Sequence, residues 1–190
     1  IYLSPNDRSL IRKASDASVL LIPAVGPKIS NDIFSKTSLK MVQVTGAGID
    51  RLDQDFCAGN NIKVCNVLGA SAKSVAEYCI FAALTISRRL SKTTDEILSG
   101  NYKELRGNII QDRMFSLSGL TLGVIGFGSI GQETAKMFSA LGCQIQYYDP
   151  SDPKVAENLS QIAVKNGKEE LLRTSDIISI HVPLIDQTKN

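Results

Sequence analysis

Short apolar segments alternate with segments of helical periodicity along most of the chain. The apolar segments have the length of strands buried in a parallel sheet, and between them apolar residues recur at spacings of three and four, as on one face of a helix. This alternation predicts an α/β protein with parallel sheets. The expected strands are 19–22, 41–44, 62–65, 122–125, 144–148, 162–164 and 177–181, and the expected helices are 28–38, 49–58, 72–90, 130–141 and 168–173.

The expected strands fall into two groups, which predicts two domains with a boundary near residue 70. Residues 1–70 hold three strands and are expected to form a small, flavodoxin-like α/β domain. Residues 71–190 hold four strands and are expected to form a Rossmann-like, doubly wound parallel sheet, whose nucleotide-binding unit begins near Leu117. Polar residues from Ser87 to Gln111 indicate a solvated helix and loop. Four strands are few for a doubly wound sheet, so both domains are expected to be incomplete.

The expected helix 72–90 is apolar on nearly all sides between Val75 and Ile86. A helix of this kind is buried on most sides, so we expect it to pack against another subunit or between domains. Glu77 interrupts the apolar surface, and burying its charge is costly unless the charge is paired. Arg88 and Arg89 are its candidate partners.

A G-x-G-x-x-G pattern, formed by Gly126, Gly128 and Gly131, lies between an expected strand and an expected helix. The first glycine permits a tight turn, the second leaves room for a pyrophosphate, and the third lets the helix lie close to the sheet. The start of the helix offers unpaired N–H groups, best placed at Ser129 and Ile130. In this context the pattern predicts a dinucleotide site. The competing interpretation is a glycine-rich turn without a ligand.

Asp149 ends the next expected strand, 18 residues after Gly131. A carboxylate in this place can accept hydrogen bonds from both hydroxyls of an adenosine ribose and repels a 2′-phosphate. The sequence therefore favours NAD over NADP. The alternative is an aspartate that only caps the loop after the strand.

A second glycine turn, residues 45–50, follows the strand 41–44. It is expected at the C-terminal edge of its sheet, where open α/β sheets bind ligands. Gly46 and Gly48 leave backbone N–H groups exposed, which suits a carboxylate or a phosphate. A plain strand-to-helix turn is the alternative interpretation.

His181 is the single histidine of the chain, and it ends a strand just before Val182-Pro183. It is the one residue that could act as a histidine acid or base, although a structural role at the strand end is the competing interpretation. The arginines 51, 106 and 113 are further candidates in expected loops, without a context that decides their role.

Composition narrows the class of partner. The 190 residues are 43% hydrophobic, and 21 basic and 19 acidic residues give a net charge of +2 without a basic stripe, so no nucleic acid is expected. Neither a signal peptide nor a run of about 18 apolar residues occurs, so no membrane is expected either. The four cysteines lack C-x-x-C spacing, which indicates no metal site and reduced thiols in a cytoplasmic protein. The expected partner is a small molecule.

Four sequence blocks, in this order, resemble the D-isomer-specific 2-hydroxyacid dehydrogenase family. Together they extend over most of the chain, and their joint occurrence is far more specific than any one of them. The blocks are Gly46–Asp53, Ser74–Glu77, Gly119–Gly131 with Asp149-Pro150, and Ser175–Leu184 with Thr188.

The resemblance implies an NAD-dependent oxidoreductase that interconverts a D-2-hydroxy acid and its 2-oxo acid. Residues 1–70 would bind the substrate and residues 71–190 the NAD. Ala47 and Gly48 would contact the substrate, and the helix Ser74–Leu90 would mediate a homodimer. The cofactor contacts implied by the resemblance are Ala47, Gly126, Phe127, Gly128, Ser129, Ile130, Gly131, Asp149, His181, Val182, Pro183 and Thr188.

The resemblance also implies that the catalytic residues are missing. The arginine, glutamate and histidine that act on the substrate in this family follow the block that ends at Leu184, so they are expected C-terminal to Asn190. His181 is then not the catalytic histidine, and these residues alone are expected to be an inactive portion of a longer chain. A strand is likewise expected before Ile1. The alternatives are an NAD-binding regulator similar to a corepressor and a remnant without activity. The sequence does not identify the 2-hydroxy acid.

Overall fold

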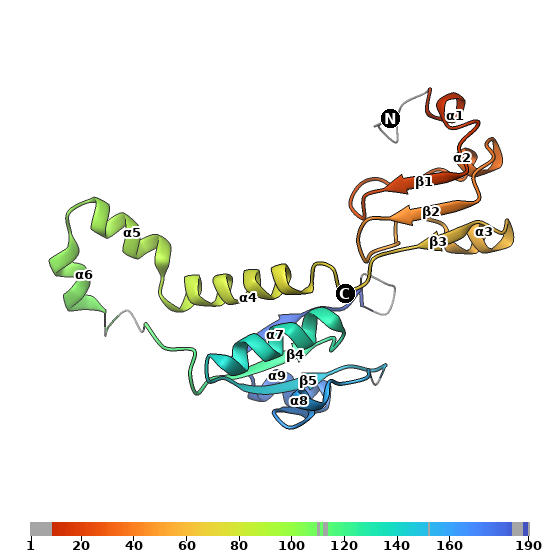
Figure 1. Ribbon diagram of the computed structural model, residues 1–190. Coiled ribbons are helices and arrows are strands. Elements are labelled where there is room, and N and C mark those ends of the chain that lie inside the picture. Colours follow the sequence, from red (N-terminus) through yellow and green to blue (C-terminus); the bar gives the residue numbers. More distant parts are fainter. Residues whose placement is uncertain (1–8, 110, 112–113, 152, 184–187, 190) are drawn as a thin grey trace. The chain divides into compact units, whose positions relative to one another are not determined.

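The structure, a computed structural model, describes residues 9–109, 111, 114–151, 153–183 and 188–189. The chain divides into two compact units, Ile1–Ala70 and Ser71–Asn190 (Figure 1). Each unit contains one sheet in which all strands are parallel, with helices packed on it. The expected α/β class with parallel sheets is therefore confirmed.

The first unit contains a three-stranded parallel sheet. Its elements are α1 (Leu10–Lys13), β1 (Val19–Ile22), α2 (Asp32–Ser35), β2 (Met41–Val44), α3 (Gln54–Gly59) and β3 (Lys63–Cys65). The strand order is β1-β2-β3, so the chain crosses the sheet in one direction. Val42 and Val44 point from β2 into the core and are fully buried, where they cluster with Phe34 of α2 and Cys57 of α3. The second glycine turn follows β2 directly.

The second unit contains a four-stranded parallel sheet. Its elements are α4 (Ala72–Ser87), α5 (Leu90–Leu98), α6 (Tyr102–Asn108), β4 (Thr121–Ile125), α7 (Ser129–Ala140), β5 (Gln144–Tyr148), α8 (Glu157–Ser160), β6 (Ala163–Lys165), α9 (Lys168–Thr174) and β7 (Ile177–Ile180). The strand order is β6-β5-β4-β7. The chain runs outward from β4 to β6 and then returns to the other side of β4. Open α/β sheets bind ligands where the order reverses in this way, here outside the ends of β4 and β7.

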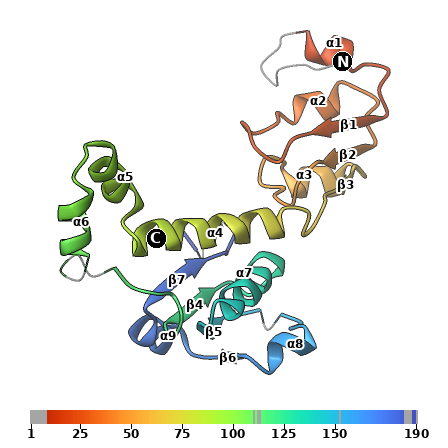
Figure 2. The ribbon, with the colours of Figure 1, turned by 60° about the vertical axis from the view of Figure 1, so that its left-hand side comes forward.

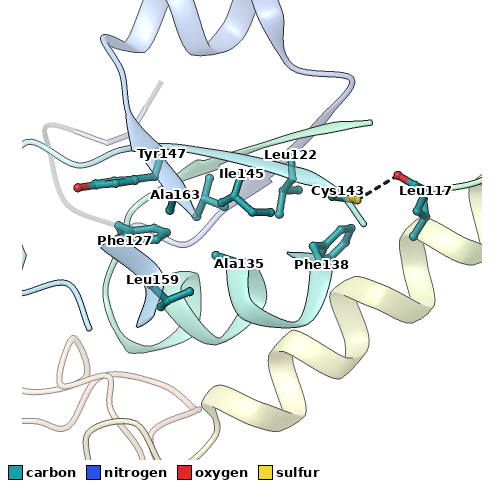
Figure 3. Packing of buried hydrophobic residues seen from close by; sticks show 11 residues of the cluster. Leu117, Leu122, Phe127, Ala135, Phe138, Cys143, Ile145, Tyr147, Leu159 and Ala163 are labelled. Atoms are coloured by element: carbon teal, nitrogen blue, oxygen red, sulfur yellow. Dashed lines mark hydrogen bonds between the residues drawn. The ribbon is translucent and has the colours of Figure 1, made fainter. Parts of the chain in front are cut away.

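Helices cover both faces of this second sheet. Val124 of β4 faces α7, because a Cβ added at Gly131 of that helix would lie 3.1 Å from Val124 Cγ1. The preceding residue, Gly123, faces α9, because a Cβ there would lie 2.7 Å from Leu171 Cδ2. Figure 3 shows the core on the α7 side, where Phe138 lies under the sheet. The sheet is doubly wound, as expected.

Glycines mark both ends of α7. Gly128 is its N-cap, and Gly142, with a φ of +85°, follows its last turn. The Gly142 N–H donates to Ser139 O at 2.9 Å and the Cys143 N–H to Phe138 O at 3.1 Å. This pair of bonds is the Schellman motif, which satisfies the last carbonyl groups of the helix.

The helix α4 is shorter than the sequence predicts, and one of its sides is exposed. It ends at Ser87 instead of Leu90, because Arg89 adopts a left-handed φ of +48°, and Leu90 begins α5. One side of α4 lies along α7 (Figures 1 and 2), and Ala76 is fully buried there. The opposite side exposes Phe81 to 59% in the single chain, so the expected packing against another subunit or between domains stays a prediction.

Candidate dinucleotide-binding site

The turn after β4 requires a glycine at its first position. Gly126 has a φ of +91°, a conformation that side chains disfavour. A Cβ added there would also lie 2.8 Å from the carbonyl carbon and oxygen of His181, where the chain leaves β7. The turn that begins the G-x-G-x-x-G pattern is therefore pressed against the end of the neighbouring strand.

The other two glycines of the pattern lie in opposite surroundings. A Cβ at Gly131 would meet the carbonyl oxygen of Gly126, so this glycine lets α7 approach the turn. Gly128, in contrast, has an ordinary φ of −73°, is exposed, and a Cβ added there would meet nothing within 4 Å. Neither the backbone nor the packing of the chain requires a glycine at position 128. The space beside it fits a ligand that approaches the backbone closely.

Unpaired N–H groups face this open space at the start of α7. The first intrahelical hydrogen bond runs from Gln132 N to Gly128 O, at 2.9 Å. The N–H groups of Ser129 and Ile130 precede it and have no acceptor within the helix. Ser129 is exposed and Ile130 is half-buried. Together with the helix dipole, these donors give the turn a partial positive charge suited to phosphate oxygens.

Phe127 contributes only its backbone to the turn. Its side chain is fully buried and stacks on Tyr147 of β5, with ring centroids 3.9 Å apart (Figure 3). Its N–H donates to Asp149 Oδ2 at 2.7 Å. The stacked rings and this hydrogen bond join the glycine turn to the end of β5.

The carboxylate of Asp149 lies beside the turn and also caps the loop that follows β5. Its Oδ1 accepts hydrogen bonds from Ser151 N at 2.8 Å and from Ser151 Oγ at 2.6 Å. Burial opposes ionisation most strongly, but the hydrogen bonds from Ser151 and Phe127 together outweigh it and lower the pKa of Asp149. The carboxylate is therefore charged at neutral pH. Three donors leave one of its roughly four acceptor positions open.

His181 is held at the switch point between β4 and β7. Its N–H donates to Ile125 O at 2.7 Å, and its Nε2 lies 2.9 Å from Ser179 Oγ. Burial lowers the pKa of the imidazole, so the ring is neutral at pH 7. No carboxylate among the described residues is hydrogen-bonded to the ring, so these contacts are of the structural kind.

The residues after His181 continue along the same edge. Val182 touches the turn, since a Cβ at Gly126 would lie 3.0 Å from Val182 Cγ1. Thr188 Oγ1 donates to Pro183 O at 2.5 Å. Leu184, the last residue of the fourth sequence block, lies outside the described residues.

In the first unit, the turn after β2 presents Ala47 and Gly48 on the surface. The Val67 N–H donates to Gly46 O at 3.0 Å, and Asn66 Nδ2 donates to Ala47 O at 2.7 Å. The segment after β3 therefore holds the glycine turn in place. Sequence reasoning missed Asn66 and Ser151; an aspartate two residues before a serine is a turn signal that could have indicated the second.

Two charged residues lie in other surroundings than the sequence suggests. Arg51 has a structural role: it is 3% exposed, and its guanidinium donates to Pro27 O at 2.8 Å and Pro23 O at 2.5 Å. Glu77 is exposed, so its charge needs no buried partner, and no ion pair with Arg88 is found in the described part of the chain. Arg106 is exposed on α6, and Arg113 lies outside the described residues.

The cysteines and the helices show neither a disulfide, a metal site nor a membrane span in the described part of the chain. All four thiols are free, and burial raises the pKa of Cys57 and of Cys143, which keeps both protonated. Within the described ranges, no three His, Cys, Asp or Glu side chains gather as metal ligands would. None of the helices described is both long and apolar enough to span a bilayer.

Comparison with known proteins identifies the family. Residues 80–190 match the family described as D-isomer specific 2-hydroxyacid dehydrogenase, NAD binding domain. The chain is 35% identical over 183 residues to D-3-phosphoglycerate dehydrogenase of Methanocaldococcus jannaschii, which covers 95% of this chain and 34% of the relative. It is 33% identical over 183 residues to hydroxypyruvate reductase of Thermotoga maritima, and this match covers 95% of this chain and 56% of the relative.

A solved structure of D-lactate dehydrogenase from Aquifex aeolicus, complexed with NAD and lactic acid, superimposes with a TM-score of 0.79 at 29% identity; the match covers 93% of this chain and 51% of that one. The chain thus spans about a third to just over half of the proteins that it matches. Their names are those of dehydrogenases and reductases, which does not favour the alternative of an NAD-binding regulator. The chain belongs to the D-isomer-specific 2-hydroxyacid dehydrogenase family and carries its NAD-binding domain.

Proposed function

We propose that this chain is the cofactor-binding portion of an NAD-dependent oxidoreductase that interconverts a D-2-hydroxy acid and its 2-oxo acid. One observation carries the proposal. The open glycine turn after β4, the charged carboxylate after β5 and the backbone after β7 meet at one sheet edge, beside the switch point. This edge is where open α/β sheets bind nucleotides.

Each part of NAD has a partner at this edge in the proposal. Gly128 would leave room for the pyrophosphate, and the N–H groups of Ser129 and Ile130 would donate hydrogen bonds to it, which the open Cβ position and the helix dipole support. Asp149 would accept hydrogen bonds from the adenosine ribose. The segment His181–Pro183 would lie beside the nicotinamide end. NAD, when bound, supplies the hydride acceptor or donor.

The charged state of Asp149 supports NAD over NADP, because a 2′-phosphate would be repelled by the carboxylate. Two ribose hydroxyls need two acceptor positions, whereas three protein donors leave one. The Ser151 hydroxyl is the donor that can rotate away, since its backbone N–H holds the same oxygen. We therefore propose that Ser151 Oγ gives up its bond to Asp149 when NAD binds.

The substrate and the proton chemistry extend the proposal beyond this site. Unit Ile1–Ala70 would bind the substrate, with its carboxylate on the exposed backbone of Ala47 and Gly48. The arginine, glutamate and histidine that act on the substrate would come from sequence outside these 190 residues. The contacts of His181 with Ser179 and with the backbone of β4, without a carboxylate partner among the described residues, support this division. Four free thiols support a cytoplasmic location.

Calorimetric titration of the 190-residue chain with NAD and with NADP tests the proposal. We expect NAD to bind more tightly than NADP. Asp149→Asn should weaken NAD about tenfold, because a charge-assisted hydrogen bond becomes a neutral one. Asp176→Asn is the matched control, since Asp176 also accepts a backbone N–H, from Thr121 at 2.8 Å, but at the opposite edge of the sheet. An absence of NAD binding to the unaltered chain would refute the proposal.

We also propose that the outer side of α4 forms a homodimer interface. Its exposed apolar side chains support this, because a continuous apolar surface marks an interaction site. They are Tyr78, exposed to 67%, Phe81 to 59% and Ile86 to 75%. Sedimentation equilibrium should give a dimer, and Phe81→Lys should give a monomer that still binds NAD. A monomeric unaltered chain would refute this interface.

A further inference from the structure

The side chain of Gln132 connects the two loops that form the candidate NAD site. It lies in the first turn of α7 and is half-buried. Its Nε2 donates to Phe127 O in the glycine turn and to Lys154 O in the segment before α8, both at 3.0 Å. Its Oε1 accepts from Ala156 N at 3.2 Å. The side chain of Asp149 also bonds to both loops, through Phe127 and Ser151, but Gln132 reaches the later part of the second loop, at Lys154 and Ala156.

These three bonds fix the orientation of the amide. Its nitrogen faces two carbonyl oxygens and its oxygen faces an N–H group, so an exchange of the two ends would place an oxygen against two acceptors. Both amide hydrogens and the carbonyl oxygen have partners. A side chain with three good bonds to the backbone restrains both segments, because moving either one breaks at least one bond.

The restraint acts on the groups that would meet the adenosine end of NAD. Phe127 is held on both sides, by Gln132 at its carbonyl and by Asp149 at its N–H. The next residue is Gly128, beside which the space is open. On the other loop, Lys154 and Ala156 follow closely after Asp149 and Ser151. Binding to loops that are already ordered costs less conformational entropy than binding that must order them.

We propose that Gln132 is a positioning residue that preorganises the glycine turn and the loop after β5 for the adenosine diphosphate half of NAD. The inference rests on the proposed function, since it assumes NAD as the ligand. It does not give Gln132 a contact with the cofactor. Its role is to hold the backbone that makes the contacts.

Two variants remove the restraint from opposite sides. Gln132→Met keeps the length of the side chain and loses all three bonds. Ala156→Pro removes only the N–H that donates to Oε1, and the exposed Ala156 has a φ of −63°, which proline also adopts. Lys136→Met is the matched control, because Lys136 is an exposed residue of the same helix, 3.7 Å from Glu133 in a surface ion pair.

The experiment measures the Kd of the 190-residue chain for NAD and for ADP-ribose, beside the thermal midpoint of each variant. We expect Gln132→Met to weaken both ligands about tenfold and Ala156→Pro about threefold, because the first loses all three hydrogen bonds and the second loses one. Lys136→Met should stay within about twofold. The equal loss for ADP-ribose is the signature of action at the adenosine diphosphate half.

The outcomes separate this inference from the proposed function. If the unaltered chain binds neither ligand, the proposed function is wrong and the inference with it. If the unaltered chain binds NAD and both variants bind equally tightly, only the inference is overturned, even where their thermal midpoints fall. If Gln132→Met does not fold, the NAD affinity of Ala156→Pro tests the inference, because Ala156 is exposed and its substitution leaves the core unchanged.

Discussion

Two glycine turns of this protein look alike in sequence but differ in the backbone conformation and the neighbours of their first glycine. Both follow a buried parallel strand, β4 in one unit and β2 in the other. In the turn after β4, Gly126 has a positive φ and lies against the backbone of His181. In the turn after β2, Gly46 has no such φ, and a Cβ there would lie 2.7 Å from the Cβ of Ala24.

The difference shows that a G-x-G pattern in a sequence does not indicate whether a glycine is needed for the fold or for a ligand. At Gly126, the strain of a positive φ and the clash with a backbone neighbour cannot be relieved by rotating a side chain. At Gly46, the clash can be relieved by a shift of the neighbouring loop. Each turn also contains a more open glycine. A Cβ at Gly48 would lie 3.0 Å from the flexible carboxylate of Asp50, and one at Gly128 would meet nothing within 4 Å. The first kind of glycine serves the fold, and the second leaves space for a ligand.

The largest effect on folding is expected from Gly126→Ala. Strain at the positive φ and the clash with His181 should together lower the free energy of unfolding by about 3 kcal/mol. Urea unfolding followed by tyrosine fluorescence measures this, since four of the five tyrosines lie in Ser71–Asn190. The control is Gly167→Ala, because Gly167 has a φ of −66° and open space around it. Equal stability of the two variants would contradict the account of the turn.

A smaller effect is expected from Gly46→Ala. The added methyl group overlaps Ala24, but the loop that carries Ala24 is partly exposed and can move, so the loss should be about 1 to 2 kcal/mol. Hydrogen exchange of the amides in β1, β2 and β3 measures the stability of this unit separately. A loss larger than that of Gly126→Ala would reverse the comparison.

His181, which presses on Gly126, makes folding depend on pH. The ordinary pKa is 6.5, and burial lowers it in the folded chain. Above pH 6.5 the ring is neutral in both states. As the pH falls below 6.5, the unfolded chain takes up the proton first, so the free energy of unfolding falls until the folded chain is protonated too.

Because His181 is the single histidine, a modest slope of stability just below pH 6.5 should vanish in His181→Gln. Urea unfolding at a series of pH values measures the slope. An unchanged slope in the variant would assign it to other groups.

Much of the fold could be predicted from the sequence because strands and glycine turns leave local signals. All seven expected strands are present, each within one residue at either end, since runs such as Ile177–Ile180 are apolar and short. The helices α1 and α8 were not predicted, and only Asp32–Ser35 of the expected helix 28–38 is helical, because helices of four residues are too short to show a clear period. The end of α4 was misplaced, because a left-handed arginine gives no signal in the sequence.

The candidate site, like the fold, could be predicted from the sequence only in part. The positions of Gly126, Gly128, Gly131 and Asp149 follow from strand ends and spacing, which a sequence displays. The partners of Arg51 and Gln132 lie on other loops, so only the folded chain shows that one is buried and the other connects two segments. Residues whose role depends on tertiary contacts were missed or misread.

The most direct test of the central claim, that the turn after β4 binds NAD, is the Kd for NAD of the Gly128→Asp variant. Gly128 and Gly167 are both N-cap glycines with open space around them, and aspartate is a better N-cap than glycine. Gly128→Asp and Gly167→Asp should therefore fold as stably as the unaltered chain. We predict that Gly128→Asp abolishes NAD binding, because its side chain fills the pyrophosphate position with a negative charge, while Gly167→Asp binds NAD normally. Equal NAD affinity of the two variants would contradict the claim.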